Sequence, residues 1–140
     1  MVKATLPLLA ALLLGACNPE PAPLVTVNDA RVTALPTSAA VYFTLANSGG
    51  PDRLLAVEAA GVGRASLHET SMDGAIMRMR AIDGGIEIPA KGQVQLAASG
   101  KHVMIQDLAK PLAPGSSIRL TLNFERQGNV TVNVSVGGPR

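Results

Sequence analysis

The side chains with the clearest coordination chemistry lie together between residues 68 and 104. This stretch holds both histidines of the chain, His68 and His102, and every methionine except Met1. Outside it, the only other soft or imidazole ligand is Cys17. Thioether sulfur binds Zn²⁺, Mg²⁺ and Ca²⁺ poorly and suits Cu(I), and imidazole suits copper as well. The clustering therefore indicates a histidine–methionine site for a soft monovalent metal ion.

The spacing within this stretch places potential ligands on common faces of β-strands. His102 and Met104 are two residues apart, and so are Met77 and Met79. Side chains alternate between the two faces of an extended strand, so each pair projects from a single face. Both pairs are therefore suited to present two donor atoms in one direction.

A turn signal predicts how part of the site is assembled. The Asp73-Gly74 pair is typical of a two-residue hairpin turn, which would fold the segment of Met79 back beside His68. Bringing His102 and Met104 to the same place requires the tertiary fold. Methionine is also a common core filler, so packing and coordination are both open for Met72 and Met77.

The rest of the chain predicts one all-β domain. Short runs rich in Val and Thr are separated by Gly, Pro, Asn and Asp turn signals, a pattern typical of a sandwich or barrel. Only three residues are aromatic, so we expect an aliphatic core and an antiparallel β-sandwich that starts near Leu24. The predicted strands are Val25–Val27, Arg31–Ala34, Ala40–Asn47, Leu54–Ala59, Ala65–Thr70, Ala75–Arg80, Ile86–Ile88, Val94–Ala97, Val103–Gln106, Ser117–Phe124 and Val130–Val136.

The N-terminus predicts export and attachment to a membrane. Residues 1–16 carry one Lys before a short apolar run that ends in small residues, which is typical of a signal peptide. The ending Leu14–Cys17 resembles the lipobox of bacterial lipoproteins, where the Cys is diacylated after cleavage. Residues 17–23 would then be a lipidated Cys and a Pro-rich tether, followed by the domain at 24–140. An ordinary signal peptide that leaves Cys17 as a free thiol is the alternative.

Composition and motifs argue against several other functions. The formal charge is only +2 with both signs interspersed, so we expect no nucleic-acid partner. A blue-copper electron-transfer site needs a Cys thiolate with two His, and Cys17 lies in the expected anchor. The chain has no GxSxG, HExxH, CxxC or P-loop motif, so we do not expect an enzyme. A structural or interaction lipoprotein whose methionines only pack is the remaining alternative.

The spacing of four of these residues resembles a known motif. His68 is followed after ten residues by Met79, and His102 is followed after one residue by Met104. This pattern is similar to the His-x10-Met…His-x-Met signature of the PCu(A)C family of extracytoplasmic bacterial copper chaperones. The segments AAVYFTLAN, LHETSMDGAIMRMR, GGIEIPAKGQVQL and KHVMIQDLAKPL also resemble that family, and the similarity extends over residues 31–136.

The resemblance implies a cupredoxin-like Greek-key β-sandwich that binds one Cu(I) per monomer through His68, Met79, His102 and Met104. It implies a periplasmic, lipid-anchored location in the bacterial cell envelope. The implied partners are copper donor and acceptor proteins, such as another periplasmic copper chaperone or the cytochrome c oxidase subunit with the dinuclear copper centre. The gap between Met79 and His102 is one residue longer than usual. The chain ends in VGGPR without a Met- and His-rich extension, so the resemblance gives no support for a second copper site.

Overall fold

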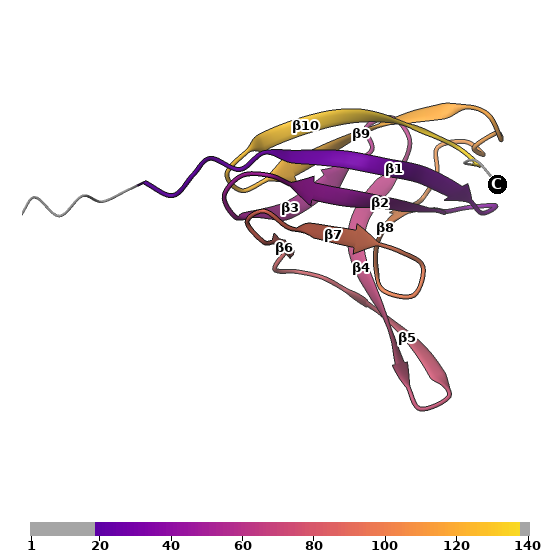
Figure 1. The fold of residues 1–140 in the computed structure, drawn as a ribbon. Helices are drawn as coiled ribbons and strands as arrows, with labels where there is room; N and C mark the ends of the chain where they lie inside the picture. The colour runs from indigo at the N-terminus through magenta and orange to yellow at the C-terminus, as the bar shows by residue number, and fades with distance from the viewer. Residues whose placement is uncertain (1–18, 138–140) are drawn as a thin grey trace, which may run out of the picture.

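The computed structural model describes residues 19–137, which fold as two antiparallel sheets packed face to face (Figure 1). The first sheet has the order β1-β2-β8-β4-β5, and β7 pairs with β2 beyond the end of β8. The second sheet has the order β10-β9-β3-β6. The strands are β1 (Val25–Ala34), β2 (Ala39–Asn47), β3 (Asp52–Glu58), β4 (Arg64–Asp73), β5 (Ile76–Ala81), β6 (Ile86–Ile88), β7 (Gln93–Leu96), β8 (Lys101–Gln106), β9 (Ser117–Phe124) and β10 (Gly128–Ser135).

The predicted antiparallel β-sandwich is confirmed. No residue of the described part is helical, and none of its segments is a helix that could cross a membrane. The expected signal peptide and the lipidation expected at Cys17 lie outside the described residues. The core between the sheets is mainly aliphatic, as expected from the scarcity of aromatic residues, although Phe43 and Phe124 are also buried in it. Its largest fully buried side chains include Leu45, Leu54, Ile105, Leu120 and Leu122.

One prediction of two separate strands was wrong in detail. The runs Val25–Val27 and Arg31–Ala34 belong to a single strand, β1, which pairs with β2 on both sides of a register shift between Asn28 and Arg31. Asp29 has a φ of 52° at this bulge. Asp tolerates the left-handed region better than most residues, so the Asn28-Asp29 turn signal makes a bulge within a strand and does not end it.

The hairpin between β4 and β5 forms as predicted, but its turn is shifted by one residue. Asp73 pairs with Ile76, so the loop consists of Gly74 and Ala75 and not of Asp73 and Gly74. Gly74 has a φ of 64°, and Ala75 does not have a positive φ. A positive φ only at the first loop residue is the pattern of a type II′ turn, in which Gly favours that position.

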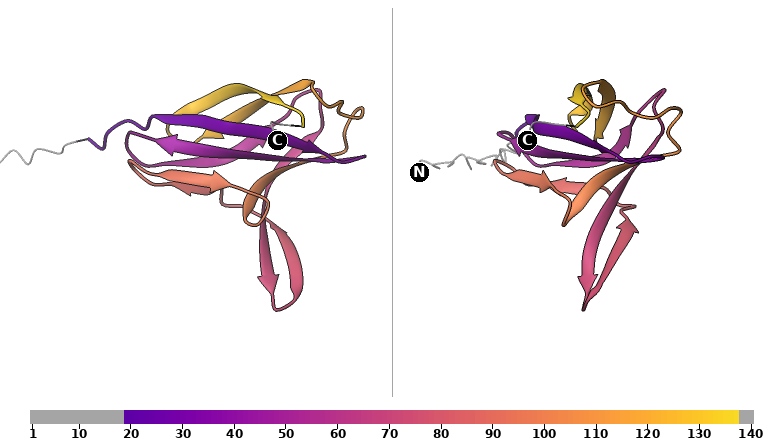
Figure 2. Two further views of the ribbon diagram at one scale, coloured as in Figure 1. Left: turned by 45° about the vertical axis from the view of Figure 1, so that its right-hand side comes forward. Right: turned by 90° about the vertical axis from the view of Figure 1, so that its right-hand side faces the viewer.

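This hairpin stands away from the sandwich (Figures 1 and 2). Residues 64–69 of β4 pair with β8, whereas the rest of β4 pairs with β5 alone. Every residue of β5 is exposed. The hairpin is therefore a two-stranded arm beyond the edge of the packed sheets.

The start of the described chain is held against the loop between β2 and β3. The Gly50 amide donates to the carbonyl of Ala22 (3.1 Å), and the Ser48 amide donates to the carbonyl of Leu24 (3.0 Å). A Cβ atom at Gly50 would overlap the carbonyl of Pro21. The absence of a side chain thus lets the Pro-rich segment lie on the domain surface, although it joins no strand.

Candidate metal site

The two histidines face each other across neighbouring strands. His68 on β4 is the direct cross-strand partner of His102 on β8. Their ring centroids are 6.2 Å apart with an interplanar angle of 27°. The neighbouring pair of Leu67 and Val103 is buried in the core. Because side chains alternate along a strand, the two imidazoles lie on the face of the sheet that is turned away from the core.

The two motif methionines flank this histidine pair on the same face. Met104 is two residues from His102 on β8 and lies opposite Ser66. Met79 lies opposite Thr70, two residues along β4 from His68. Met104 and Met79 are therefore on opposite sides of the histidine pair along the strand direction. The structure places His68 and His102 directly opposite each other, and the strand register puts the Met79 and Met104 side chains on the same face of the sheet as the two imidazoles.

The hydrogen bonds of His102 leave one ring nitrogen free. His102 is buried, and its Nδ1 lies 3.0 Å from the carbonyl oxygen of Gly100. A carbonyl oxygen can only accept, so Nδ1 carries the proton and donates to it. The lone pair is then on Nε2. A backbone hydrogen bond of this kind fixes the tautomer of a metal-binding imidazole.

His68 contains a buried nitrogen without a partner. Its Nε2 lies 2.8 Å from the hydroxyl oxygen of Ser66, while its Nδ1 is buried and has no hydrogen bond. The tautomer that avoids an unsatisfied N–H is the one in which Nε2–H donates to Ser66 and Nδ1 keeps its lone pair. The donor chemistry of both imidazoles therefore fits a metal ion that takes neutral nitrogen ligands.

Partial burial also favours the neutral form of His68. Desolvation lowers the pKa of His68 below its ordinary value, and the neighbouring His102 lowers it further. A charged imidazolium cannot bind a metal ion, so a lowered pKa keeps the ring available as a ligand at more acidic pH.

An aromatic residue that sequence reasoning missed closes one side of the histidine pair. The ring of Tyr42 on β2 lies 6.2 Å from that of His102 and is tilted by 54°. The guanidinium of Arg31, the cross-strand partner of Tyr42 on β1, lies 5.3 Å from the centre of the Tyr42 ring. The sequence held no local signal for this contact, because Tyr42 and His102 meet only through the pairing of β2 with β8.

The four methionines of the stretch differ in exposure. Met104 is partly buried, whereas Met79 is 52% exposed. Met72 and Met77 are 61% and 69% exposed and lie opposite each other on the hairpin. This exposure shows that Met72 and Met77 do not pack in the core, whereas packing at the surface and coordination both stay open.

No alternative site with hard ligands is present in residues 19–137. This part of the chain has no group of three or more His, Cys, Asp or Glu side chains arranged to hold a metal ion. The candidate ligands at the histidine pair are therefore the two imidazoles and the neighbouring thioethers. Uncharged nitrogen and sulfur donors favour Cu(I) over Zn²⁺, Mg²⁺ or Ca²⁺.

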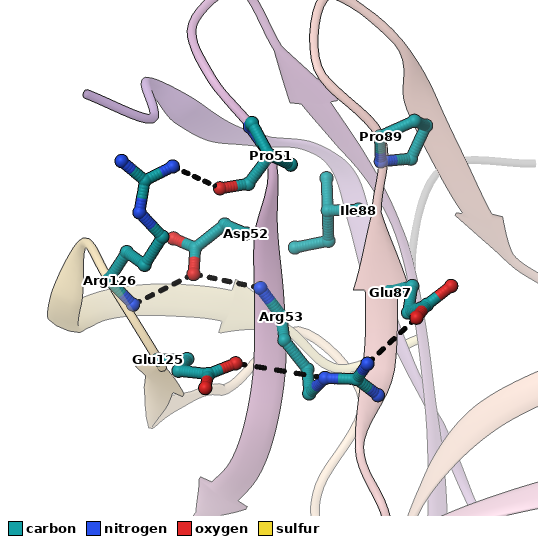
Figure 3. A pocket seen from close by; sticks show the side chains of 8 residues that line it. All are labelled: Pro51, Asp52, Arg53, Glu87, Ile88, Pro89, Glu125 and Arg126. Carbon is teal, nitrogen blue, oxygen red and sulfur yellow. Dashed lines mark hydrogen bonds and ion pairs between the residues drawn. The ribbon is translucent and has the colours of Figure 1, made fainter. Parts of the chain in front are cut away.

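A hollow on the second sheet is lined by charged side chains, but these bind one another (Figure 3). Arg53 lies 2.8 Å from Glu87 and 3.7 Å from Glu125. The buried carboxylate of Asp52 accepts hydrogen bonds from the amides of Arg53, Arg126 and Gln127. These contacts tie β3 to β6 and to the turn between β9 and β10, so the hollow is best explained as part of the scaffold.

Comparisons with known proteins identify a family model and two relatives. The family model described as "Putative lipoprotein LpqE-like" matches residues 25–136. The "Putative lipoprotein Lxx21020" of Leifsonia xyli subsp. xyli is 31% identical over 80% of this chain and 69% of its own length. RP573 of Rickettsia prowazekii is 26% identical over 71% of this chain and 56% of its own length.

Similar solved structures include domains with and without copper. The copper-bound PCuAC domain from PmoF2 has a TM-score of 0.66 and 28% identity, covering 82% of this chain and 93% of that domain. The apo PCuAC domain from PmoF1 has a TM-score of 0.69 and 27% identity, with 82% and 94% covered. CuI-DR1885 from Deinococcus radiodurans has a TM-score of 0.62 and 30% identity, with 91% and 85% covered.

Proposed function

Because the chain belongs to the LpqE-like family, we propose that it is a Cu(I)-binding metallochaperone of the PCuAC type. The resemblance to the PCu(A)C family is confirmed by these matches. The observation that carries the proposal is the direct pairing of His68 with His102, flanked on one outer face by Met79 and Met104. The neighbours PmoF2 and DR1885 were solved with copper bound, which supports the same cargo here.

The proposed ligands suit an ion that is carried and not used in a reaction. His68 and His102 supply neutral imidazoles. Met79 and Met104 supply neutral thioethers that do not titrate. The bound Cu(I) with its four ligands therefore carries a single positive charge. His102 is buried and held by Gly100, which makes it the fixed part of the site. Met79 is half exposed on the hairpin, which makes it the ligand that an acceptor can displace first.

Delivery then takes place by exchange of ligands. An incoming donor group of the acceptor replaces the exposed thioether, and the ion moves without a change of oxidation state. This role needs neither a nucleophile nor a general base, in line with our expectation that the protein is not an enzyme. We propose as acceptor a copper-containing protein of the cell envelope, such as the cytochrome c oxidase subunit with the dinuclear centre, or another periplasmic copper chaperone.

We also propose that the domain is anchored to a membrane through a lipidated Cys17, after cleavage of residues 1–16. The lipoprotein description of the family supports this. The segment just after the anchor is partly fixed, since the guanidinium of Arg126 lies 3.1 Å from the Pro21 carbonyl and 3.8 Å from Glu20. The domain would therefore stay close to the bilayer surface on the periplasmic side.

The test is a titration of the purified full-length protein in detergent with Cu(I), in competition with a chromogenic Cu(I) chelator. We expect one tightly bound equivalent, and X-ray absorption at the copper edge should detect both nitrogen and sulfur ligands. His68→Ala and His102→Ala should each abolish effective competition. Folded protein that fails to compete would contradict the proposal and favour a structural lipoprotein whose methionines have no metal role.

A further inference from the structure

The methionines at the end of the hairpin have no packing role within the described chain. Met72 and Met77 are cross-strand partners, and both are mostly exposed. The hairpin is two-stranded at this point and projects from the sandwich (Figures 1 and 2). A side chain that stays in water gains no free energy from burial, so hydrophobic packing does not explain these two thioethers.

Met79 shares their face of the hairpin. It is two residues from Met77 on β5, and it is a diagonal neighbour of Met72 across the strand pair. Directly opposite residues have Cβ atoms about 5 Å apart, and diagonal neighbours remain within reach of long side chains. Because methionine side chains are unbranched and flexible, three sulfur atoms can converge on one ion.

The face of the hairpin that carries the thioethers is free of charged side chains. Arg78 and Arg80 alternate with Met77 and Met79 and so point to the reverse face, where Arg78 pairs with Asp73 at 3.3 Å. Ile76, the other large apolar residue of the hairpin end, also lies on the reverse face. The three methionines therefore form a separate, uncharged group of soft donors and not part of a wider apolar patch.

We propose that Met72, Met77 and Met79 form a second, weaker Cu(I) site through which the cargo enters and leaves the site at the histidine pair. This inference rests on the proposed function, because Met79 serves both sites. Met72 is four positions along β4 from His68, which corresponds to about 13 Å of strand. Met79 lies opposite Thr70, midway between Met72 and His68 along β4, so it is placed to take part in both sites.

The transfer between the two sites proceeds by stepwise ligand exchange. An ion held by three thioethers keeps its bond to Met79 while Met72 and Met77 are replaced by the imidazoles and Met104. The ion remains Cu(I), all ligands are neutral, and no proton moves. The histidine site binds more tightly because it adds two imidazole ligands, whereas the hairpin site is open to solvent and to a partner protein.

The test follows the methionine methyl groups by NMR in full-length protein labelled with ¹³C-methyl methionine, during titration with Cu(I) under reducing conditions. We expect the first equivalent to shift the signals of Met79 and Met104, and further Cu(I) to shift those of Met72 and Met77. The double variant Met72→Leu/Met77→Leu should keep the first equivalent, lose the second, and release Cu(I) to a chelator several-fold more slowly. Ile76→Leu, on the reverse face, is the matched control and should behave like the unaltered protein.

The possible outcomes separate this inference from the proposed function. If Met72 and Met77 signals stay unchanged in excess Cu(I) while the first site fills, the hairpin site is wrong and the chaperone function stands. If they shift while Met104 does not, the thioether site is supported and the proposed site at the histidine pair is wrong. If the double variant releases Cu(I) as fast as the unaltered protein, the transfer role is wrong. Leucine preserves volume and hydrophobicity, so loss of the second equivalent cannot be attributed to loss of an apolar surface.

Discussion

Tyr42 packs at a tilt beside His102, with 6.2 Å between the ring centroids, and Arg31 lies over the Tyr42 ring. The three residues come from three adjacent strands, β1, β2 and β8. They cover the buried imidazole on the side opposite to His68. The face that carries the proposed metal ligands is therefore closed on the side of Tyr42 and open on the side of Met79 and the hairpin.

Removal of the Tyr42 ring should weaken Cu(I) binding. In Tyr42→Ala, water can reach His102, and the orientation of the imidazole is less restricted. We therefore expect the affinity for Cu(I) to fall by about tenfold. This is the lower end of the range found when a group that orients a metal ligand is removed. Tyr42→Phe keeps the ring and should bind Cu(I) as the unaltered protein does. The measurement is competition with a chromogenic chelator. Equal affinities of the Ala and Phe variants would mean that the ring contact has no effect on the site.

Substitution of Met104 by Leu should separate metal binding from folding. The exchange conserves volume, so the free energy of unfolding should fall by less than about 1.5 kcal/mol. The sulfur is lost, so Cu(I) affinity should fall, and X-ray absorption should show fewer sulfur ligands. Denaturant unfolding and chelator competition on the same sample provide the two values. Unchanged affinity in Met104→Leu would remove Met104 from the proposed site.

The stability of the metal-free protein should depend on the protonation of His68. Its pKa is lowered in the folded state by burial and by His102, whereas the unfolded chain keeps the ordinary value of about 6.5. The unfolded state therefore binds a proton first as the pH falls. The contribution of His68 to stability is complete above pH 6.5 and is lost as the pH falls through the lower, folded pKa.

The pH effect can be measured by denaturant unfolding across this range, with an NMR titration of the His68 ring in parallel. In His68→Gln, the pH dependence between the two pKa values should become weaker. A His68 ring that titrates at or above 6.5 in the folded protein would contradict the burial argument.

Substitution of Cys17 by Ser should release the protein from membranes without affecting the metal site. We expect the variant in the soluble fraction of cells, because the acylated thiol is missing. Cu(I) affinity should be unchanged, since Cys17 is not among the proposed ligands. Fractionation and chelator competition test the two statements separately. Loss of Cu(I) binding in Cys17→Ser would mean that the thiol is a ligand and not an anchor.

The sequence alone predicted most of the strands and the residue types of the proposed site. The alternation of apolar residues (Ile118, Leu120, Leu122 and Phe124) with polar ones predicted β9 at its observed bounds. This was possible because the burial pattern of a strand follows from the alternation of residue types along it. The same period of two predicted that His102 and Met104 share a face. The Gly at position 74 predicted the hairpin, although the register of β4 with β5 moved its turn by one residue.

Only the tertiary structure decided which residues meet across strands. The pairing of His68 with His102, and the contact of Tyr42 with His102, depend on β8 lying between β2 and β4. The exposure of Met72 and Met77 depends on where β8 begins, at Lys101 opposite Glu69, because β4 pairs with β5 alone beyond that point. These features arise from contacts between segments far apart in the chain, whereas the patterns that can be read in a sequence report only local periodicity and turn chemistry.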